Sequence, residues 1–392
     1  MSADIRNMSE VTTAKIFFPN LDGLRFLAFF LVYLQHAFHS LFTSTNFGFV
    51  FFVLKEGLFH SGDTGVSFFF SLSGFLITYL ILNEVKILGK LDVLSFYIRR
   101  ILRIWPLYYF VIIFGFLIYP KLKMALGFPG YIEAGNPLLH TFFLSNFDVM
   151  TLPRKFGAAS LNITWTVSVE EQFYLIWPLL FFFIRPRFFK YIFPAIIIIS
   201  ALFRLSYIND MKIIKFHTLS VISDMAVGGW AAYFSLASKK FKSFFTNMKA
   251  FEILLIYAVF IFTLLFDEYL FIGHVLMMLR RVIFSAFFVF VILEQNFAEN
   301  SLLKMSRVKA VSELGKYTYG LYLLHPIALT VCLNTARFLG VNPRNLAIGF
   351  LLGSLVFIVN ILLSWASYNF YEKKFLRLKE RFTHIRNAVV QK

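Results

Sequence analysis

The sequence predicts an all-α, polytopic integral membrane protein with about ten transmembrane helices in one bundle. Of its 392 residues, 59% are hydrophobic and only 15% are charged, which is more apolar surface than one soluble core buries. About ten apolar runs are long enough to cross the roughly 30 Å hydrocarbon layer of a bilayer. Lys and Arg residues cluster in alternate connections between these runs. These three observations define the fold class.

The expected helices follow one another along most of the chain. Runs of this length indicate spanning helices because each residue adds about 1.5 Å to an α-helix. The run at 274–294 is the least regular, since Arg280 and Arg281 fall inside it. The expected spans are 22–41, 65–84, 102–120, 167–184, 191–208, 218–236, 251–266, 274–294, 315–336 and 346–369.

The distribution of Lys and Arg predicts that both termini are cytoplasmic. The positive-inside rule places the basic connections in the cytoplasm and the poorer ones outside, such as the short loop with Asp267 and Glu268. Two cytoplasmic termini require an even number of crossings, and ten satisfies this. We therefore expect a cytoplasmic N-terminal segment at 1–19, a transmembrane domain at 20–375 and a basic cytoplasmic tail at 376–392.

Charge and cysteine content exclude several classes of function. The net charge of +17 would suit nucleic acid, but the basic residues stand where orientation signals belong, so we predict the lipid bilayer and no nucleic acid as a partner. The single Cys332 provides neither a disulfide framework nor a thiolate site. The sequence lacks HExxH, HxxxH and cysteine clusters, so we predict no metal site.

The first expected helix carries two ionisable residues that share one face. Arg25 and His36 are eleven residues apart, which is close to three helical turns and roughly 16 Å along the axis. Ionisable residues are costly inside a membrane, so each needs a structural or functional reason. With the helix running outward, Arg25 is expected near the cytoplasm and His36 in the outer half of the bilayer.

The second and third expected helices add small residues and a basic cluster. Ser67, Ser71 and Gly74 form a small-residue face, which favours close helix packing over direct chemistry. Arg100 and Arg103 are one turn apart on the third helix. They either anchor the helix at the lipid headgroups or form a clamp for phosphates, which suit the fork-shaped guanidinium group.

The fourth expected helix begins with two adjacent carboxylates. Glu170 and Glu171 stand in its first turns, about 100° apart around the axis, so both cannot face one partner. The sequence leaves open which of them faces a polar interior. For Asp224 and His325, helix packing and substrate contact are equally expected. The candidate substrate-lining residues are Ser67, Ser73, Trp165, Asp224, Tyr319 and His325.

Six sequence blocks resemble those of the membrane acyltransferase 3 family, in the same order, from Asn20 to Phe375. The first resembles the family's Arg-x10-His signature, and the third and fourth resemble its Arg-x-x-Arg-Ile-x-Pro block and its Trp-Ser/Thr-x-Ser-x-Glu-x-Gln-Phe-Tyr block. The six runs are NLDGLRFLAFFLVYLQH, TGVSFFFSLSGFLIT, IRRILRIWPLYY, ITWTVSVEEQFYLIWP, GKYTYGLYLLHP and SYNFYEKKF.

The resemblance implies a multi-pass inner-membrane enzyme that takes acyl groups, commonly acetyl from acetyl-CoA, and places them on hydroxyls of extracytoplasmic carbohydrate or glycolipid. By position, Arg25 and His36 match the functional pair of the family. Arg100 and Arg103 match its cytoplasmic Arg motif, and Glu171 or Glu170 matches its fourth-helix carboxylate. The sequence departs from the family at Ser67, where an Asp is common.

Residues and resemblance together predict an O-acyltransferase mechanism. Arg100 and Arg103, helped by Arg25, hold the phosphates of acyl-CoA, which is a donor substrate and not a bound cofactor. His36 acts as general base or transient acyl carrier, and the Glu171 carboxylate orients its ring. The alternative is a membrane transporter or proton-coupled exporter, which uses the same kinds of intramembrane residue. The acceptor sugar, the acyl length and oligomer formation stay open.

Overall fold

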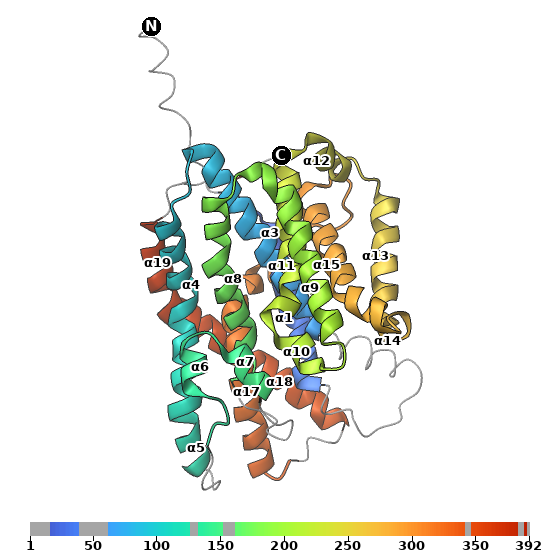
Figure 1. Cartoon of the computed structure of the whole chain (residues 1–392). Coiled ribbons are helices and arrows are strands. Elements are labelled where there is room, and N and C mark those ends of the chain that lie inside the picture. Colours follow the sequence, from blue (N-terminus) through green and yellow to red (C-terminus); the bar gives the residue numbers. More distant parts are fainter. Residues whose placement is uncertain are drawn as a thin grey trace.

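The computed structural model describes most of the chain as a bundle of long α-helices (Figure 1). The end of the first expected span, 39–41, and parts of the expected terminal segments 1–19 and 376–392 lie outside the described residues. The described residues are 16–38, 62–125, 132–151, 161–341, 346–382 and 388–389.

The N-terminal half of the chain forms four long helices, α1, α3, α4 and α8, together with shorter elements. The elements in order are β1 (Ile16–Phe17), α1 (Asn20–Phe38), α3 (Gly62–Leu88), α4 (Val93–Ile113), the π-helical η4 (Phe114–Ile118), α5 (Tyr119–Ala125), α6 (Pro137–Thr141), α7 (Ser145–Thr151) and α8 (Thr164–Phe183). Helix α4 begins where the Asp92 side chain accepts a hydrogen bond from the Ser95 backbone N–H at 2.9 Å, which is an N-cap interaction.

The second half completes the bundle. Its elements are η5 (Pro186–Phe188), α9 (Phe189–Ser206), α10 (Met211–Phe216), α11 (Thr218–Ala237), α12 (Lys239–Thr246), α13 (Ala250–Leu265), α14 (Asp267–Leu270), α15 (His274–Phe297), η6 (Met305–Arg307), α16 (Lys309–Gly315), α17 (Thr318–Phe338), α18 (Leu346–Ala366), the π-helical η7 (Ser367–Glu372), α19 (Lys373–Glu380) and β2 (Ala388–Val389). The two-residue strands β1 and β2 pair in parallel, so the two ends of the described chain meet.

The all-α membrane fold is confirmed, and a helix coincides with each expected span. Seven helical stretches in the described part of the chain are long and apolar enough to cross a membrane, and the bent pair α12 and α13 adds an eighth. Helices α8 and α17 fall short of that hydropathy because they carry polar residues, among them Glu170, Glu171 and His325. The count of ten crossings and the cytoplasmic termini stay predictions.

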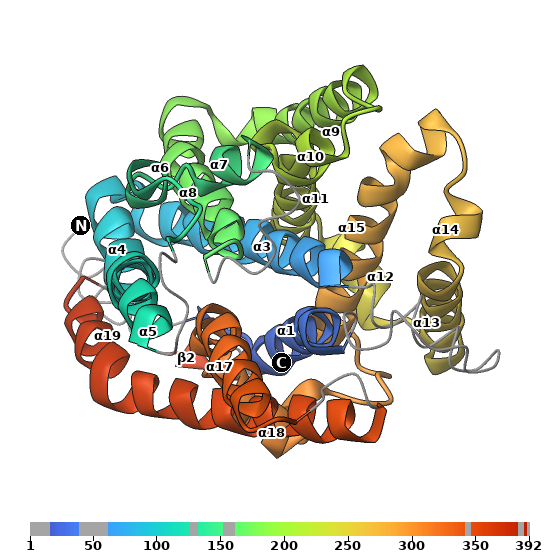
Figure 2. The same cartoon turned by 90° about the horizontal axis from the view of Figure 1, so that it is seen from below.

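Helix α3 runs through the middle of the bundle between α1 and α11, as Figure 2 shows. Where α3 contacts α11, two glycine positions have no room for a side chain. A Cβ at Gly74 would stand 2.0 Å from the Met225 carbonyl oxygen, and one at Gly228 would stand 2.0 Å from that of Ser71. The backbones of α3 and α11 therefore touch, which confirms close packing as the role of this small-residue face.

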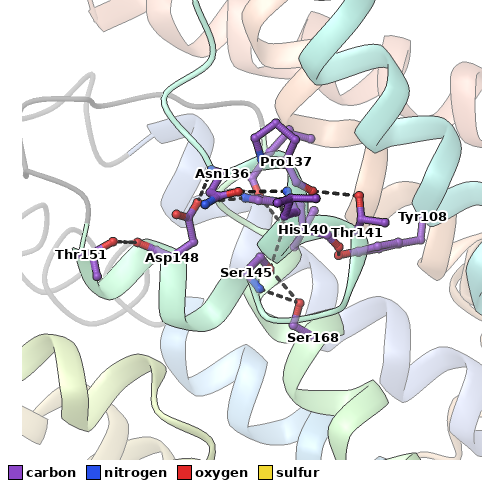
Figure 3. Close-up of polar contacts among 12 residues, drawn as sticks. Tyr108, Asn136, Pro137, His140, Thr141, Ser145, Asp148, Thr151 and Ser168 are labelled. Atoms are coloured by element: carbon purple, nitrogen blue, oxygen red, sulfur yellow. Dashed lines mark hydrogen bonds and ion pairs between the residues drawn. The ribbon is translucent and has the colours of Figure 1, made fainter.

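A polar network fixes the short helices α6 and α7 against the start of α8 (Figure 3). The Asp148 carboxylate accepts a hydrogen bond from the Asn136 backbone N–H at 2.9 Å and lies 3.3 Å from His140 Nε2. The hydroxyl oxygens of Ser145 and Ser168 are 2.7 Å apart. These side chains are buried, so hydrogen bonding among them compensates for their burial. The network holds this end of α8 in place.

Candidate active site

Two cavities lie inside the bundle and meet at Val66 and Tyr322, which line both of them. We call them the inner cavity and the outer cavity, after the predicted orientation of α1. The inner cavity has a volume of about 130 Å³, and its polar lining is Arg25, Ser73, Arg100, Arg103, Thr166, Glu170, Tyr174, Lys316, Thr318, Tyr319 and Tyr322. The outer cavity has a volume of about 150 Å³, and its polar lining includes Gln35, His36, Asp63, Asn162, Trp165 and Lys215.

Helix α1 contributes a charged residue to one cavity and a titratable residue to the other. Arg25 lines the inner cavity and His36 lines the outer one. The two residues that the sequence places on one face of this helix therefore line two different cavities. Arg25 also forms an ion pair with Asp22, one helical turn earlier, at 2.6 Å.

The three arginines of α4, Arg99, Arg100 and Arg103, lie in two different surroundings. Arg100 and Arg103 line the inner cavity. The guanidinium of Arg100 lies over the rings of Phe96 and Tyr174, 5.5 Å from each centroid, and its buried Nε has no hydrogen-bond partner among the described residues. Arg99 instead donates to the Glu84 carboxylate at 3.0 Å, on another side of the helix. Two of the three arginines are therefore available to a ligand.

The structure separates the adjacent carboxylates of α8. Glu170 lines the inner cavity, where it accepts hydrogen bonds from the hydroxyls of Ser73 and of Tyr174, the latter at 2.9 Å. Glu171 points toward α4 and accepts a hydrogen bond from Trp105 Nε1 at 2.9 Å. Glu170 is the carboxylate that faces the polar interior, and neither carboxylate belongs to the outer cavity that contains His36. The expected contact of Glu171 with the His36 ring is not formed.

The hydrogen bond of His36 defines the nitrogen that is free to react. Its Nδ1 lies 2.9 Å from the backbone carbonyl oxygen of Val32. A carbonyl oxygen only accepts hydrogen bonds, so Nδ1 carries the proton of the neutral ring and Nε2 has the lone pair. The His325 ring lies behind it, with a centroid separation of 5.0 Å, and its Nδ1 contacts the Tyr322 carbonyl oxygen in the same way. His36 thus presents a base inside a polar cavity.

Asp63 and Lys215 are site residues that the sequence analysis missed. They line the outer cavity with His36 and form an ion pair at 2.7 Å. Asp63 stands in the first turn of α3, one helical turn before Ser67, where the family often has Asp. That one-turn offset was the available signal for Asp63. Lys215 lies on α10, a six-residue helix within a connection, and no pattern in the sequence marked it.

The remaining predicted residues occupy different places. Ser73 and Tyr319 line the inner cavity, and Trp165 lines the outer one. Ser67 is buried on α3 and lines neither cavity. Asp224 also lies outside both linings and forms an ion pair with Arg281 at 2.7 Å.

A metal site does not form in the described ranges. No group of three or more His, Cys, Asp or Glu residues there is arranged to hold a metal ion.

Comparison with known families connects this geometry to a class of proteins. The family model Acyl_transf_3, described as an acyltransferase domain, matches residues 18–369, which is most of the chain. The chain belongs to the acyltransferase 3 family. The matched region includes both cavities, and five of the six sequence blocks, all but SYNFYEKKF, contribute residues to their linings. The protein is a multi-pass membrane member of this family.

Curated relatives are O-acetyltransferases by name. The chain is 32% identical over 169 residues to "Peptidoglycan O-acetyltransferase OatA" of Listeria monocytogenes, covering 41% of this chain and 23% of that protein. It is 28% identical over 180 residues to "O-acetyltransferase OatA" of Staphylococcus aureus, covering 44% of this chain and 26% of that protein. The matched part of the chain thus spans about a quarter of the length of these relatives. No solved structure gives a significant match.

Proposed function

We propose that this membrane protein transfers an acyl group, most simply acetyl, from acyl-CoA on the cytoplasmic side to a hydroxyl of an extracytoplasmic glycan. The observation that carries the proposal is the pair of cavities along α1, with Arg25 in one and His36 in the other. Peptidoglycan is the acceptor class that the relative's name suggests. The bacterial inner, or cytoplasmic, membrane is the proposed location, since donor and acceptor lie on its opposite sides.

The inner cavity suits the phosphates of the donor. Arg25, Arg100, Arg103 and Lys316 line it, and Glu170 is the acidic residue of the lining. Arginine binds phosphate through two parallel N–H donors, and such charge-assisted hydrogen bonds are stronger than neutral ones. The Arg100 side chain lines this cavity and forms no ion pair among the described residues, so a bound phosphate gives it an anionic partner. The thioester end of the donor then extends past Tyr322 toward the outer cavity.

The outer cavity suits activation of the acceptor hydroxyl. The lone pair of His36 Nε2 takes the hydroxyl proton while the hydroxyl oxygen attacks the thioester carbonyl carbon. The resulting tetrahedral intermediate collapses as the carbon–sulfur bond breaks. The departing thiolate takes the proton from His36, which restores the neutral ring. Asp63 is the carboxylate of this lining, and its negative charge, partly offset by the ion pair with Lys215, stabilises the transient imidazolium.

Transfer in proteoliposomes tests this function. Acetyl-CoA is supplied on one side and soluble peptidoglycan fragments on the other, and mass spectrometry measures acetylated fragments. We expect His36→Gln to lower the rate by about 10²- to 10⁴-fold, the usual contribution of a general base. His274→Gln, an exposed position at the start of α15, is the matched control. A folded His36→Gln protein with normal transfer would contradict the proposal.

The same preparation separates the enzyme from a transporter and the base from an acyl carrier. An enzyme consumes the thioester only when the acceptor is present, whereas a transporter moves its substrate unchanged. If His36 carries the acyl group, donor alone labels the protein at this histidine. Direct transfer leaves the protein unlabelled, and this is the result that we expect.

A further inference from the structure

Helix α1 presents a second polar side chain to the outer cavity, one residue before the proposed base. Gln35 and His36 both line this cavity, and consecutive residues stand about 100° apart around a helix. An amide and a base on one helix therefore approach the outer cavity from two directions. Acyl transfer through His36 alone leaves Gln35 without a role.

The start of α3 determines which end of the Gln35 amide faces the cavity. Gln35 Oε1 occupies the space beside the Gly62 backbone, where a Cβ at Gly62 would stand 2.0 Å from this oxygen. Oε1 is buried there and accepts no hydrogen bond from any described residue. An amide oxygen fits against a Cα–H group, whereas an NH2 group in its place would bury two N–H donors. The NH2 group is therefore the end of the amide that faces the cavity.

This NH2 group is a hydrogen-bond donor without a partner in the part of the chain that the structure describes. Gln35 Nε2 donates to no described residue and, unlike Oε1, is not enclosed by protein atoms. Lys215, the cation of the same lining, is by contrast paired with Asp63 at 2.7 Å. Gln35 thus keeps both of its N–H donors for a bound substrate.

Backbone packing fixes the position of this amide relative to the base. A Cβ at Gly65 would stand 2.6 Å from the Ala28 carbonyl oxygen, so α1 and α3 touch about one turn from Gly62. Gln35 is therefore held between two helices that cannot shift independently. A donor that is in place before the substrate arrives needs no reorganisation during the reaction, and this property makes oxyanion-hole donors effective.

We propose that Gln35 Nε2 donates a hydrogen bond to the carbonyl oxygen of the acyl group and stabilises the negative charge that this oxygen gains during transfer. This inference rests on the proposed function and adds a catalytic residue to it. When the acceptor hydroxyl oxygen bonds to the thioester carbon, one electron pair of the C=O bond moves to the carbonyl oxygen. That pair returns as the C–S bond breaks. The N–H donor therefore contributes most in the tetrahedral intermediate and its transition states.

Steady-state kinetics of transfer in proteoliposomes test this assignment. Gln35→Leu keeps a side chain of similar size and removes the donor, and we expect kcat to fall about 10²- to 10³-fold while the acceptor KM stays within about threefold of wild type. Asn83→Leu is the matched control, because the Asn83 amide donates to the Tyr79 carbonyl oxygen at 2.8 Å and lines neither cavity. A raised acceptor KM with wild-type kcat would show that Gln35 binds the acceptor instead, and the proposal would be wrong.

A donor with sulfur in place of the carbonyl oxygen separates hydrogen bonding from a structural effect. Sulfur accepts hydrogen bonds weakly, so the dithioester analogue of acetyl-CoA loses the contact with Gln35 Nε2 in an unaltered protein. We expect the ratio of the acetyl-CoA rate to the dithioester rate to be at least about tenfold higher in wild type than in Gln35→Leu. Equal ratios in the two proteins would overturn the hydrogen bond.

Gly62→Ala provides a second variant if Gln35→Leu does not fold. The new methyl group takes the space of Gln35 Oε1 and turns the amide out of its position. Gln35→Glu keeps the length of the side chain and, when ionised, has no N–H donor. Both changes are expected to lower kcat. Folded variants with wild-type kcat would overturn the role of Gln35, whereas absence of any acetyl transfer by wild type would overturn the proposed function.

Discussion

Replacement of Arg100 by Gln is the sharpest test of the donor site. The substitution keeps a hydrogen-bonding side chain of moderate length but removes the positive charge and the forked donors. Arg100 lines the inner cavity and has no ion-pair partner among the described residues, so a bound phosphate supplies the acceptor for its guanidinium. A charge-assisted hydrogen bond contributes about 1.5–3 kcal/mol. Its loss therefore predicts a donor KM raised by roughly 10- to 150-fold, with a smaller change in kcat.

The adjacent Arg99 provides the control for this test. Its guanidinium donates to the Glu84 carboxylate at 3.0 Å and to the Phe382 carbonyl oxygen at 2.8 Å, outside the inner cavity. We expect Arg99→Gln to lower thermal stability and to leave the donor KM unchanged. Initial rates at several acyl-CoA concentrations measure KM, and unfolding in detergent measures stability. An unchanged donor KM in folded Arg100→Gln protein would refute the assignment of the inner cavity to phosphate.

Three further predictions address the outer cavity and the helix contacts. Asp63→Asn lowers kcat by about 10- to 100-fold and leaves the donor KM unchanged, because the lost carboxylate stabilises the imidazolium. A rise in donor KM as large as the fall in kcat would contradict this. Gly228→Ala costs about 1–3 kcal/mol by forcing α3 from α11, whereas Gly320→Ala, with its nearest contact at 3.3 Å, costs less in detergent unfolding. Trp105→Phe leaves Glu171 without its donor and costs about 1–3 kcal/mol, which unfolding measurements check.

The sequence was sufficient to predict the helices and the two ionisable residues that α1 contributes to the cavities. Apolar runs determine spanning helices because the bilayer leaves few alternatives, and the ten expected spans all coincide with helices. Arg25 and His36 were predictable as a pair because helical periodicity alone relates them. Ser71 and Gly74 were predictable as a packing face for the same reason.

The helical periodicity of the sequence does not predict which side chains of different helices meet. Glu170 and Glu171 are neighbours in sequence, and their division between the inner cavity and Trp105 depends on where α3 and α4 lie around α8. Lys215 lines the same cavity as His36 and lies in a connection whose path no local pattern specifies. Tyr322 lines both cavities, and no pattern in the sequence marked it.

Asp224 illustrates how tertiary contacts decide between two interpretations of a buried carboxylate. The sequence made a substrate contact and helix packing equally expected for it. In the structure its side chain is fully buried, accepts a hydrogen bond from Ser285 at 2.8 Å and forms an ion pair with Arg281 on α15. Both of its oxygens are therefore bound by side chains of one neighbouring helix, α15.

The ion pair gives a prediction that separates packing from substrate binding. Asp224→Asn leaves the Arg281 charge without its partner in apolar surroundings, and breaking such a buried pair costs about 3–5 kcal/mol. Replacing both residues, with Asp224→Leu and Arg281→Met, removes the unpaired charge and is expected to restore most of the stability in detergent unfolding. Donor and acceptor KM stay at wild-type values in the double variant. If instead the single variant keeps its stability and its acceptor KM rises, Asp224 contacts substrate, and the packing assignment is wrong.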